Sequence, residues 1–344
     1  MVAHLRLWSF VPPILLATLV GTVATAVDRL ASPPGGLQLA RAASDYGSSS
    51  IRINEAETTP PYPRESVDSD DLRVRVSGPV SRIVSQSRTT DEYLYSIVSP
   101  RTLLAVSGSA YQQSSSNVYS YVAKFHPVIA SDPERVLRLD PDLIFVSSTA
   151  RADFVSLVRN TGVPTYRMFT MFTNLDQVAE SIRAVGYLTG ADEAARNEEA
   201  RFRSELATAL GMRTPGQARP RILGLGGSAC YGRDTLFNDI VEKLGGVNVG
   251  AEGGVKGYEN VGSEIILRWD PEWIVTAADP GKSEQARARL LADPAIALTQ
   301  AARQGHILVF DNRILFSMSP FTLSLVNAMA RELYGKPHEA AGGV

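Results

Sequence analysis

A thirteen-residue segment occurs twice in this chain, first at 134–146 and again at 264–276. The two copies align without gaps and share Glu, Leu, Arg, Asp, Pro and Ile at matching positions. Each copy predicts a short amphipathic helix that ends at Asp-Pro, because proline disfavours helical backbone at the residue before it. An apolar strand is expected to follow each helix. The repeat therefore predicts two similar α/β halves.

The order of the expected elements also favours two lobes. The chain has 344 residues, 44% of them hydrophobic, which suits two cores of ordinary size better than one very large core. Apolar strands are expected at 82–87, 103–106, 143–146, 164–168, 221–226, 273–276 and 307–310. Helices are expected at 90–98, 152–160, 236–244 and 320–333. This alternation is typical of Rossmann-like lobes with parallel sheets.

One long helix is expected to join the lobes. Between residues 174 and 210 the apolar positions keep helical spacing, interrupted at Thr189-Gly190, which predicts a nearly continuous helix. Two lobes joined in this way should leave a ligand cleft between them, because ligands bind at domain interfaces and at the carboxyl ends of parallel strands. A single helical connector should also keep the opening angle modest.

The expected organisation has six parts. They are a signal peptide at 1–26, a disordered linker at 27–78, an N-terminal lobe at 79–168, the connecting helix at 169–212, a C-terminal lobe at 213–338 and a tail at 339–344. The linker is rich in Ser, Pro, Gly and Asp and has no sustained periodicity, which is typical of disorder. Order is expected to begin with the strand at residue 82.

The N-terminus predicts export. An apolar run at 7–23 precedes Ala-Thr-Ala at 24–26, the small-x-small pattern of a signal peptidase site. Two prolines interrupt the run, so an uncleaved membrane anchor is the alternative. In both cases the body of the chain is expected in the periplasm or another extracytoplasmic space.

Charge and metal-ligating residues exclude several classes of partner. Lys and Arg total 34 against 36 Asp and Glu, a net charge of -2, which favours neither nucleic acid nor an anionic membrane surface. The single cysteine, Cys230, excludes an internal disulfide. The four histidines of the chain are scattered and do not have the spacing of a zinc or manganese site, so no metal site or cofactor is expected. A monomer is expected.

Several short motifs, taken in order, resemble one family. They are Arg82-Ile-Val-Ser, Leu104-Ala-Val-Ser, Leu139-Asp-Pro-Asp-Leu, Gly162-Val-Pro, Asp234-Thr-Leu-Phe and Leu244-Gly-Gly-Val-Asn. Their order and spacing resemble the helical-backbone substrate-binding proteins of ABC importers for cobalamin, haem and ferric siderophores. The resemblance implies a solute-binding protein that is not an enzyme. It would capture such a chelate and deliver it to an ABC-type permease with its cytoplasmic ATPase.

The first residue of each repeat, Glu134 or Glu264, lies in the first turn of an expected helix. A carboxylate there stabilises a helix by about 0.3–1 kcal/mol, but Asp would serve equally well. The resemblance implies that both glutamates dock onto arginines of the permease, one from each lobe. An exposed ion pair contributes only about 0.2–1 kcal/mol, so such contacts would set orientation more than affinity.

Loops after strand ends supply the candidate ligand-binding residues. These are Arg88, Tyr111, Tyr231, Arg233 and Tyr258. The arginines could neutralise a carboxylate or an anionic iron chelate, and the tyrosines could place rings against a ligand. Each could equally be an ordinary surface arginine or a packing tyrosine. His126 or Tyr111 could ligate haem iron, although a histidine before proline is more often structural.

An exported α/β enzyme is the alternative function. The segment 224–229, Gly-Leu-Gly-Gly-Ser-Ala, follows an expected strand and partly matches a dinucleotide-binding turn, but the third glycine of that motif is absent. Ser228 and Cys230 lack the surrounding pattern of a nucleophile, so no catalytic residue is assigned. A tethered sensor without a transporter is a further alternative. The sequence does not name the chelate.

Overall fold

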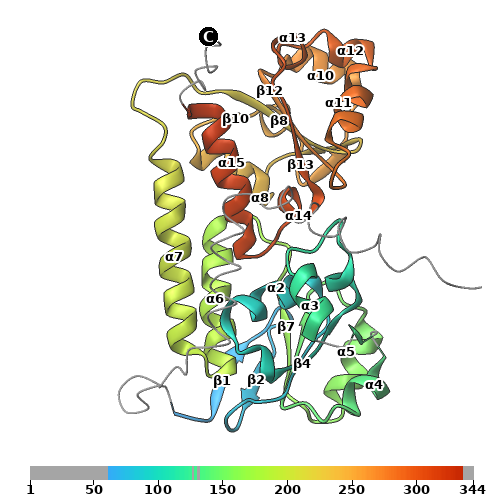
Figure 1. The fold of residues 1–344 in the computed structure, drawn as a ribbon, viewed down its shortest axis with the longest axis vertical. Coiled ribbons are helices and arrows are strands. Elements are labelled where there is room, and N and C mark those ends of the chain that lie inside the picture. Colours follow the sequence, from blue (N-terminus) through green and yellow to red (C-terminus); the bar gives the residue numbers. More distant parts are fainter. Residues whose placement is uncertain (1–60, 126–127, 130–131, 336–344) are drawn as a thin grey trace, which may run out of the picture. The chain divides into compact units, whose positions relative to one another are not determined.

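The computed structural model describes residues 61–125, 128–129 and 132–335, all within one compact unit, Ile53–Val344. The expected signal peptide, the linker up to residue 60, His126 and the tail at 339–344 lie outside the described residues. Two larger sheets and one small sheet carry the described strands (Figure 1). The two larger sheets mark two α/β lobes, which confirms the expected fold class.

The first lobe is built on a five-stranded parallel sheet with the spatial order β5-β4-β3-β6-β7. Its strands are β3 (Ile83–Ser85), β4 (Leu103–Ser107), β5 (Val128–Ile129), β6 (Leu143–Ser147) and β7 (Thr165–Met168). Its helices are α2 (Arg88–Ile97), η1 (Pro100–Thr102), η2 (Gly108–Tyr111), α3 (Tyr119–Phe125), α4 (Pro133–Leu137) and α5 (Ala152–Arg159). The expected strand and helix positions in this lobe are confirmed to within a few residues.

Strand β6 shows why this sheet is buried on both faces. Leu143 and Phe145 belong to one hydrophobic core, whereas Ile144 and Val146 belong to another. Successive side chains of a strand point to opposite faces, so a wholly apolar strand serves two cores at once. The loop that follows β6 is therefore held at the carboxyl edge of a rigid sheet.

The connection between the lobes differs from the expected continuous helix. Gly190 has φ 78 and ends α6 (Leu175–Thr189), so the chain reverses before α7 (Asp192–Leu210) and the two helices pack together (Figure 1). At Gly186 a Cβ atom would lie 2.1 Å from the Cβ of Ala195, so glycine is needed for this close approach. The single helix α7 then contacts both α2 of the first lobe and α15 (Leu323–Tyr334) of the second.

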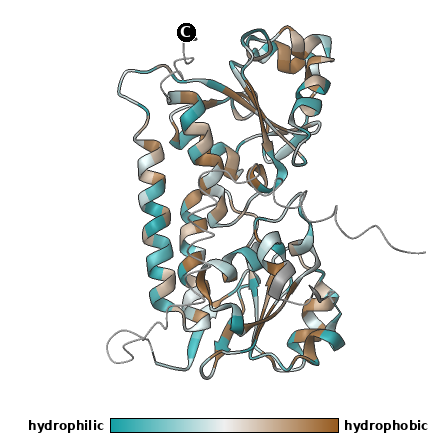
Figure 2. Ribbon diagram, viewed as in Figure 1, coloured by the Kyte–Doolittle hydropathy of each residue, from teal (hydrophilic) through white to brown (hydrophobic). Residues whose placement is uncertain are grey.

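Helix α7 buries only a small part of its surface. Its buried residues are Ala195, Glu198, Phe202 and Ala209. Figure 2 shows mainly hydrophilic residues along much of its length, in contrast to the hydrophobic strands of the two larger sheets. A narrow apolar stripe with a charged opposite face is the pattern of a helix that packs on one side only.

The second lobe has a mixed six-stranded sheet. Its strands are β8 (Arg221–Gly226), β9 (Ala229–Tyr231), β10 (Val247–Asn248), β11 (Tyr258–Asn260), β12 (Trp273–Ala278) and β13 (Ile307–Asp311). The pairs β10-β8, β8-β12 and β12-β13 are parallel, as expected. The pairs β8-β9 and β9-β11 are antiparallel, which the expectation of purely parallel sheets missed.

Short helices connect the strands of this lobe. They are α8 (Leu236–Lys243), α9 (Val249–Glu252), α10 (Ser263–Trp269), α11 (Ser283–Leu291), α12 (Pro294–Ala297), α13 (Gln300–Gln304), α14 (Asn312–Leu315) and η3 (Pro320–Thr322), which leads into α15. Helix α14 and the residues that follow it bring the chain back from β13 toward the first lobe.

The sequence repeat forms equivalent units in the two lobes. In the first copy α4 leads to β6, and in the second α10 leads to β12. The aspartates before the prolines, Asp140 and Asp270, have φ values of 49 and 42. Aspartate enters this left-handed region more readily than most residues other than glycine. In the second copy Asp270 is the C-cap of α10, as the sequence predicts, whereas in the first copy α4 already ends at Leu137, three residues before Asp140.

Ordered structure begins nearer to the N-terminus than the sequence analysis predicts. Strands β1 (Arg64–Val67) and β2 (Arg73–Val76) form an antiparallel hairpin. Val74 and Val76 join the core of the first lobe, and the Arg64 side chain is fully buried. The prediction of a disordered linker is therefore wrong for residues 64–76. The alternation of exposed and buried residues in β2 spans only four positions, too few to stand out from a polar background.

Candidate ligand-binding site

A cavity of about 600 Å³ opens at the carboxyl end of the first lobe's strands. This volume lies within the range of about 300–1,000 Å³ that is usual for ligand pockets. The wall comes from the loops after β3, β4, β6 and β7, and from second-lobe residues that follow α14. The lining residues are Gln86, Ser87, Arg88, Thr89, Ser109, Ser147, Thr149, Ala150, Arg151, Phe154, Thr170, Met171, Phe316 and Met318.

The chemistry of this wall is restricted. Hydroxyl groups, two guanidinium groups and the Gln86 amide supply its polarity, and Phe154, Met171, Phe316 and Met318 supply apolar surface. Among the described lining residues there is no His, Cys, Tyr, Asp or Glu. The wall can thus accept an apolar ring system and hydrogen-bond its edge, but apart from the methionine thioethers it offers none of the usual protein ligands for iron.

Hydrogen bonds fix the hydroxyl groups of the wall. The Ser147 hydroxyl lies 2.6 Å from that of Thr170 and 2.8 Å from that of Thr149. The amide of Gln86 donates to the Ser85 carbonyl at 3.0 Å, but its side-chain oxygen is buried without a partner among the described protein atoms. An unpaired buried acceptor costs about 1–3 kcal/mol. A ligand with an N–H or O–H group could remove that cost.

Arg88 lies in the cavity wall and touches both lobes. Its Nη1 atom donates to the carbonyl of Ser115 at 3.0 Å, and Nη2 donates to the carbonyl of Phe316 at 3.2 Å. The guanidinium therefore already holds the second-lobe wall against the first lobe. Of the five residues predicted to bind ligand, Arg88 is the one that lines this cavity.

A buried carboxylate beside Arg88 forms a second contact between the lobes. Glu92 is 1% exposed, and its Oε1 accepts hydrogen bonds from the backbone and side-chain amides of Asn117, both at 3.1 Å. Its Oε2 accepts from the hydroxyl of Ser319 in the second lobe. Asn117 also donates to the carbonyl of Arg313 at 2.9 Å. Burial raises the pKa of Glu92, and these donors oppose that rise.

Tyr231 and Tyr258 contact each other on the neighbouring strands β9 and β11. Their rings pack edge to face with centroids 5.3 Å apart, and Tyr258 is 46% exposed whereas Tyr231 is buried. A Cβ atom at Gly226 would lie 2.3 Å from the Tyr231 hydroxyl, so glycine there makes room for this ring. Tyr258 therefore presents an aromatic surface on the second lobe, with the buried Tyr231 packed behind it, and neither residue lines the cavity.

Tyr111 and Arg233 do not line the cavity either. Tyr111 is half-buried against the core of the first lobe, and its hydroxyl donates to the carbonyl of Val122 at 3.0 Å. Arg233 is exposed, and its backbone pairs with that of Lys256. Their roles in ligand binding stay predictions.

Glu134 and Glu264 are both exposed in the first turn of their helices. Asp132 caps α4 by accepting a hydrogen bond from the backbone amide of Glu134 at 3.0 Å, and Gly262 precedes α10. The Glu134 side chain is 83% exposed and pairs with Arg138 at 3.3 Å. An exposed pair of this kind is weak, so the carboxylate can exchange partners at little cost.

The structure does not support the alternative that segment 224–229 is the active site of an enzyme. Segment 224–229 is a hairpin between the antiparallel strands β8 and β9, with Gly227 in the turn at φ 64. A dinucleotide-binding turn opens a helix, and none begins here. Burial raises the pKa of Cys230 to about 12, which makes its thiol unreactive. Within 61–125, 128–129 and 132–335 there is no group of His, Cys, Asp and Glu side chains that could hold a metal ion.

Sequence reasoning missed most of the cavity wall. Ser147 and Thr170 follow predicted strands closely, so the rule that ligands bind at strand ends could have identified them. Phe316 and Met318 follow the short helix α14, and no local pattern marks them.

None of the helices in the described part of the chain is long and apolar enough to span a membrane.

Comparisons with known proteins identify the family of this chain. The profile of the periplasmic binding protein family matches residues 83–314. A cobalamin-binding protein of Halobacterium salinarum is 24% identical over 281 residues, which cover 80% of this chain and 75% of that protein.

Solved structures show the same fold. A periplasmic haem-binding protein of Roseiflexus sp. RS-1 in apo form has a TM-score of 0.64 at 23% identity, covering 75% of this chain and 98% of its own. A possible iron-binding solute-binding protein of Staphylococcus epidermidis has a TM-score of 0.65 at 18% identity, covering 75% and 100%. These proteins are solute-binding proteins rather than enzymes, and what they bind is a ligand rather than a cofactor. The chain belongs to the periplasmic binding protein family.

Proposed function

We propose that this protein is an exported receptor that captures a metal chelate in the cavity and delivers it to an ABC permease. The proposal about the ligand rests on the composition of the cavity wall. Apolar side chains from both lobes, fixed hydroxyl groups and Arg88 suit a large ring system with polar edges. Because the described wall offers so few metal donors, a metal that arrives with its coordination already complete fits best.

Cobalamin is the first ligand to test. Its metal is held by the ligand's own ring, and a relative that covers most of this chain is a cobalamin-binding protein. Ferric siderophores share the property of a complete coordination sphere and are the second class. Haem would require an axial ligand from the protein, for which Met171 and Met318 are the candidates in the described wall.

Delivery to a permease is the second half of the proposal. Membership of the family implies an extracytoplasmic location, and an exported receptor needs a membrane partner to pass its ligand inward. The exposed carboxylates of Glu134 and Glu264 lie in equivalent positions of the two lobes. Docking by these groups to basic residues of a permease would orient the receptor through weak, exposed ion pairs.

A binding panel tests the ligand proposal. Cyanocobalamin, hemin, ferrichrome and ferric enterobactin are added separately to the purified protein, and thermal unfolding is followed. A ligand at a hundred times its dissociation constant stabilises the folded state by about 2.7 kcal/mol, which gives a measurable shift. We expect cyanocobalamin to shift the unfolding transition. If none of the four compounds does so, the proposed ligand class is wrong.

A matched pair of variants tests whether the ligand binds in this cavity. Met171→Glu introduces a charge into the cavity wall at a residue that is 46% exposed and so tolerates substitution. Thr208→Glu introduces the same charge on the exposed face of α7. We expect Met171→Glu to weaken chelate binding at least tenfold and Thr208→Glu to leave it unchanged. Equal binding by both variants would place the ligand elsewhere, and Tyr258→Ala would then test the aromatic surface.

A further inference from the structure

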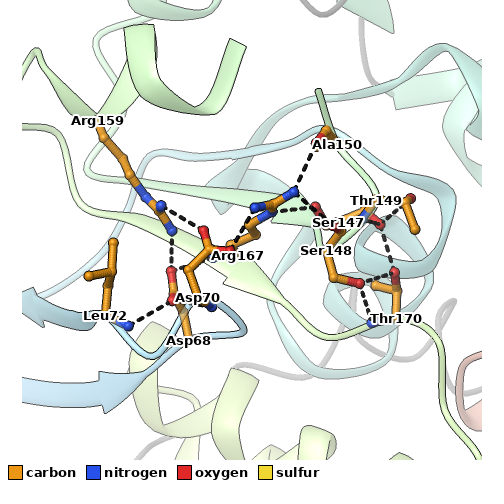
Figure 3. A network of polar contacts seen from close by, with 10 residues as sticks. All are labelled: Asp68, Asp70, Leu72, Ser147, Ser148, Thr149, Ala150, Arg159, Arg167 and Thr170. Atoms are coloured by element: carbon orange, nitrogen blue, oxygen red, sulfur yellow. Dashed lines mark hydrogen bonds and ion pairs between the residues drawn. The ribbon is translucent and has the colours of Figure 1, made fainter. Parts of the chain in front are cut away.

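The hairpin β1-β2 lies before the region that matches the family, and its turn docks on the first lobe (Figure 3). Asp68 organises this turn. Its side chain is buried, and its Oδ1 accepts hydrogen bonds from the backbone amides of Asp70 at 2.9 Å and Leu72 at 3.2 Å. The turn therefore presents a fixed pair of carboxylates, those of Asp68 and Asp70.

Two arginines of the first lobe bind these carboxylates. Arg159, at the end of α5, pairs with Asp68 and also with Asp70 at 2.8 Å. Arg167, on β7, pairs with Asp70 at 2.7 Å. The backbone amide of Ser69 donates to the carbonyl of Arg167 at 2.9 Å. The Arg159 and Arg167 side chains are only 22% and 17% exposed, so water screens these pairs less than it screens surface ion pairs.

Arg167 also reaches the cavity wall. Its guanidinium donates to the carbonyls of Ser148 at 2.8 Å and Ala150 at 2.9 Å, and more weakly to that of Ser147 at 3.4 Å. Ser147, Thr149 and Ala150 line the cavity. Figure 3 shows this side chain between the carboxylates of the hairpin and the loop at 147–150. One guanidinium thus connects a turn outside the family region with the ligand-binding wall.

The other end of β1 is anchored as well. The Arg64 side chain is fully buried, donates to the carbonyl of Tyr187 at 2.5 Å and pairs with Asp192 at 2.8 Å. Asp192 is the first residue of α7, the helix that contacts both lobes. The hairpin is therefore held at one end by the helical connection and at the other by the loop that lines the cavity.

We propose that the hairpin is a brace that fixes the cavity loop at 147–150, with Asp70 and Arg167 as positioning residues. The side chain of Asp70 holds the guanidinium in the orientation that binds the loop carbonyls. Without that carboxylate, Arg167 can leave those carbonyls for water, and the loop loses its fixed position. The consequence for chelate binding rests on the proposed function, whereas the position of the loop does not.

Hydrogen exchange on the ligand-free, full-length protein tests the brace. Three amides report on the loop: Ser148 bonded to the Met168 carbonyl, Thr149 to the Ser147 hydroxyl, and Ala150 to the Ser147 carbonyl. In Asp70→Ala we expect these amides to exchange at least tenfold faster than in the wild-type protein. Asp70→Glu keeps the carboxylate and should restore part of the protection.

The control lies on the same hairpin. Glu65 pairs with Arg73 and Arg75, both on the exposed face of the same hairpin, so Glu65→Gln should leave hydrogen exchange of the loop amides unchanged. The amide of Ile274 in the second lobe reports general destabilisation. If the loop amides of Asp70→Ala exchange at the wild-type rate, the brace proposal is wrong. It is also wrong if the Ile274 amide is accelerated by the same factor.

Binding of cyanocobalamin separates the two proposals. We expect Asp70→Ala to raise the dissociation constant at least fivefold, mainly through faster dissociation, while Glu65→Gln binds as the wild-type protein does. If the loop amides of Asp70→Ala exchange faster while its affinity for cyanocobalamin is unchanged, the brace positions the loop but does not contribute to ligand binding. If wild-type protein fails to bind cyanocobalamin, the cobalamin assignment is wrong, and the exchange experiment alone decides whether the brace exists.

Discussion

Ser319 donates a hydrogen bond of 2.5 Å to the buried carboxylate of Glu92, and this bond joins side chains of the two lobes that are 227 positions apart in the sequence. The same second-lobe segment accepts hydrogen bonds from Asn117 at the Arg313 carbonyl and from Arg88 at the Phe316 carbonyl. The lobes are therefore held by buried polar contacts beside the cavity as well as by the helical connection. Ligand binding and lobe contact share residues at this place.

The first prediction concerns Ser319. Ser319→Ala removes one donor to a buried carboxylate, and a hydrogen bond to a charged group typically contributes about 1.5–3 kcal/mol. We expect the free energy of unfolding in urea to fall by about that amount. Ser96→Ala is the control, because its hydroxyl bonds within α2 to the Tyr93 carbonyl and does not join the lobes. Similar losses in both variants would contradict a special role for the Ser319 contact.

The second prediction concerns Asp91, whose pKa burial raises to about 7, even though Ser107 donates to it. The folded state keeps a proton that the unfolded chain releases near pH 3.8. Tighter proton binding by Asp91 in the folded state therefore stabilises the fold. This stabilisation is complete below about pH 4 and is lost as the pH rises through 7. Between pH 5 and pH 8 the loss should be roughly 2–3 kcal/mol.

Substitution isolates this effect from the other carboxylates. Asp91→Asn cannot titrate, so its stability should vary less between pH 5 and pH 8 than that of the wild-type protein. Asp71→Asn, at an exposed position, should follow the wild-type curve. Denaturant unfolding at several pH values measures the difference. Parallel curves for wild type and Asp91→Asn would show that Asp91 keeps an ordinary pKa.

The third prediction concerns the anchor of the hairpin at Asp192. Asp192→Ala removes the carboxylate that pairs with the buried guanidinium of Arg64, which lies between the rings of Tyr62 and Tyr187. Loss of one partner from a buried pair typically costs about 3–5 kcal/mol. Asp176→Ala, in an exposed pair with Arg203, should cost less than about 1 kcal/mol. Chemical denaturation of the two variants checks this order, and a reversed order would refute it.

The fourth prediction concerns the permease. Reversing both charges, with Glu134→Arg and Glu264→Arg, should reduce uptake by cells that contain the cognate permease at least tenfold, because both docking pairs become repulsive. Chelate affinity of the purified variant should not change. Glu284→Arg is a matched control, since Glu284 is also exposed in the first turn of a helix and pairs weakly with Arg287. Uptake at the wild-type rate by the double variant would exclude docking through these glutamates.

The elements of the repeat could be predicted from the sequence because their signals are local. Asp-Pro ends a helix through the steric demands of adjacent residues, and an apolar run such as 143–146 reports burial directly. The reversal at Gly190 was visible only as an interruption of the helical spacing. Whether such a glycine bends a helix or ends it depends on what the next helix can pack against, here Ala195 against Gly186.

The candidate site was less accessible to sequence reasoning. Arg88 was identified, and Ser147 and Thr170 follow from the strand-end rule once the strands are placed. Phe316 and Met318 reach the cavity only because α14 returns the chain toward the first lobe. The hairpin looks like part of a disordered linker in the sequence, because its folding depends on the distant partners Arg159, Arg167 and Asp192.

Local patterns in the sequence predict the two α/β lobes, the positions of most strands and helices, and the two glutamates at equivalent helix starts. These features follow from the spacing of apolar residues and from local backbone preferences. The folded protein adds that the connection reverses at Gly190, that the hairpin is bound to the cavity loop, and which side chains form the cavity wall. Those features depend on contacts between residues far apart in the chain, such as Glu92 and Ser319, and no local pattern records such a pairing.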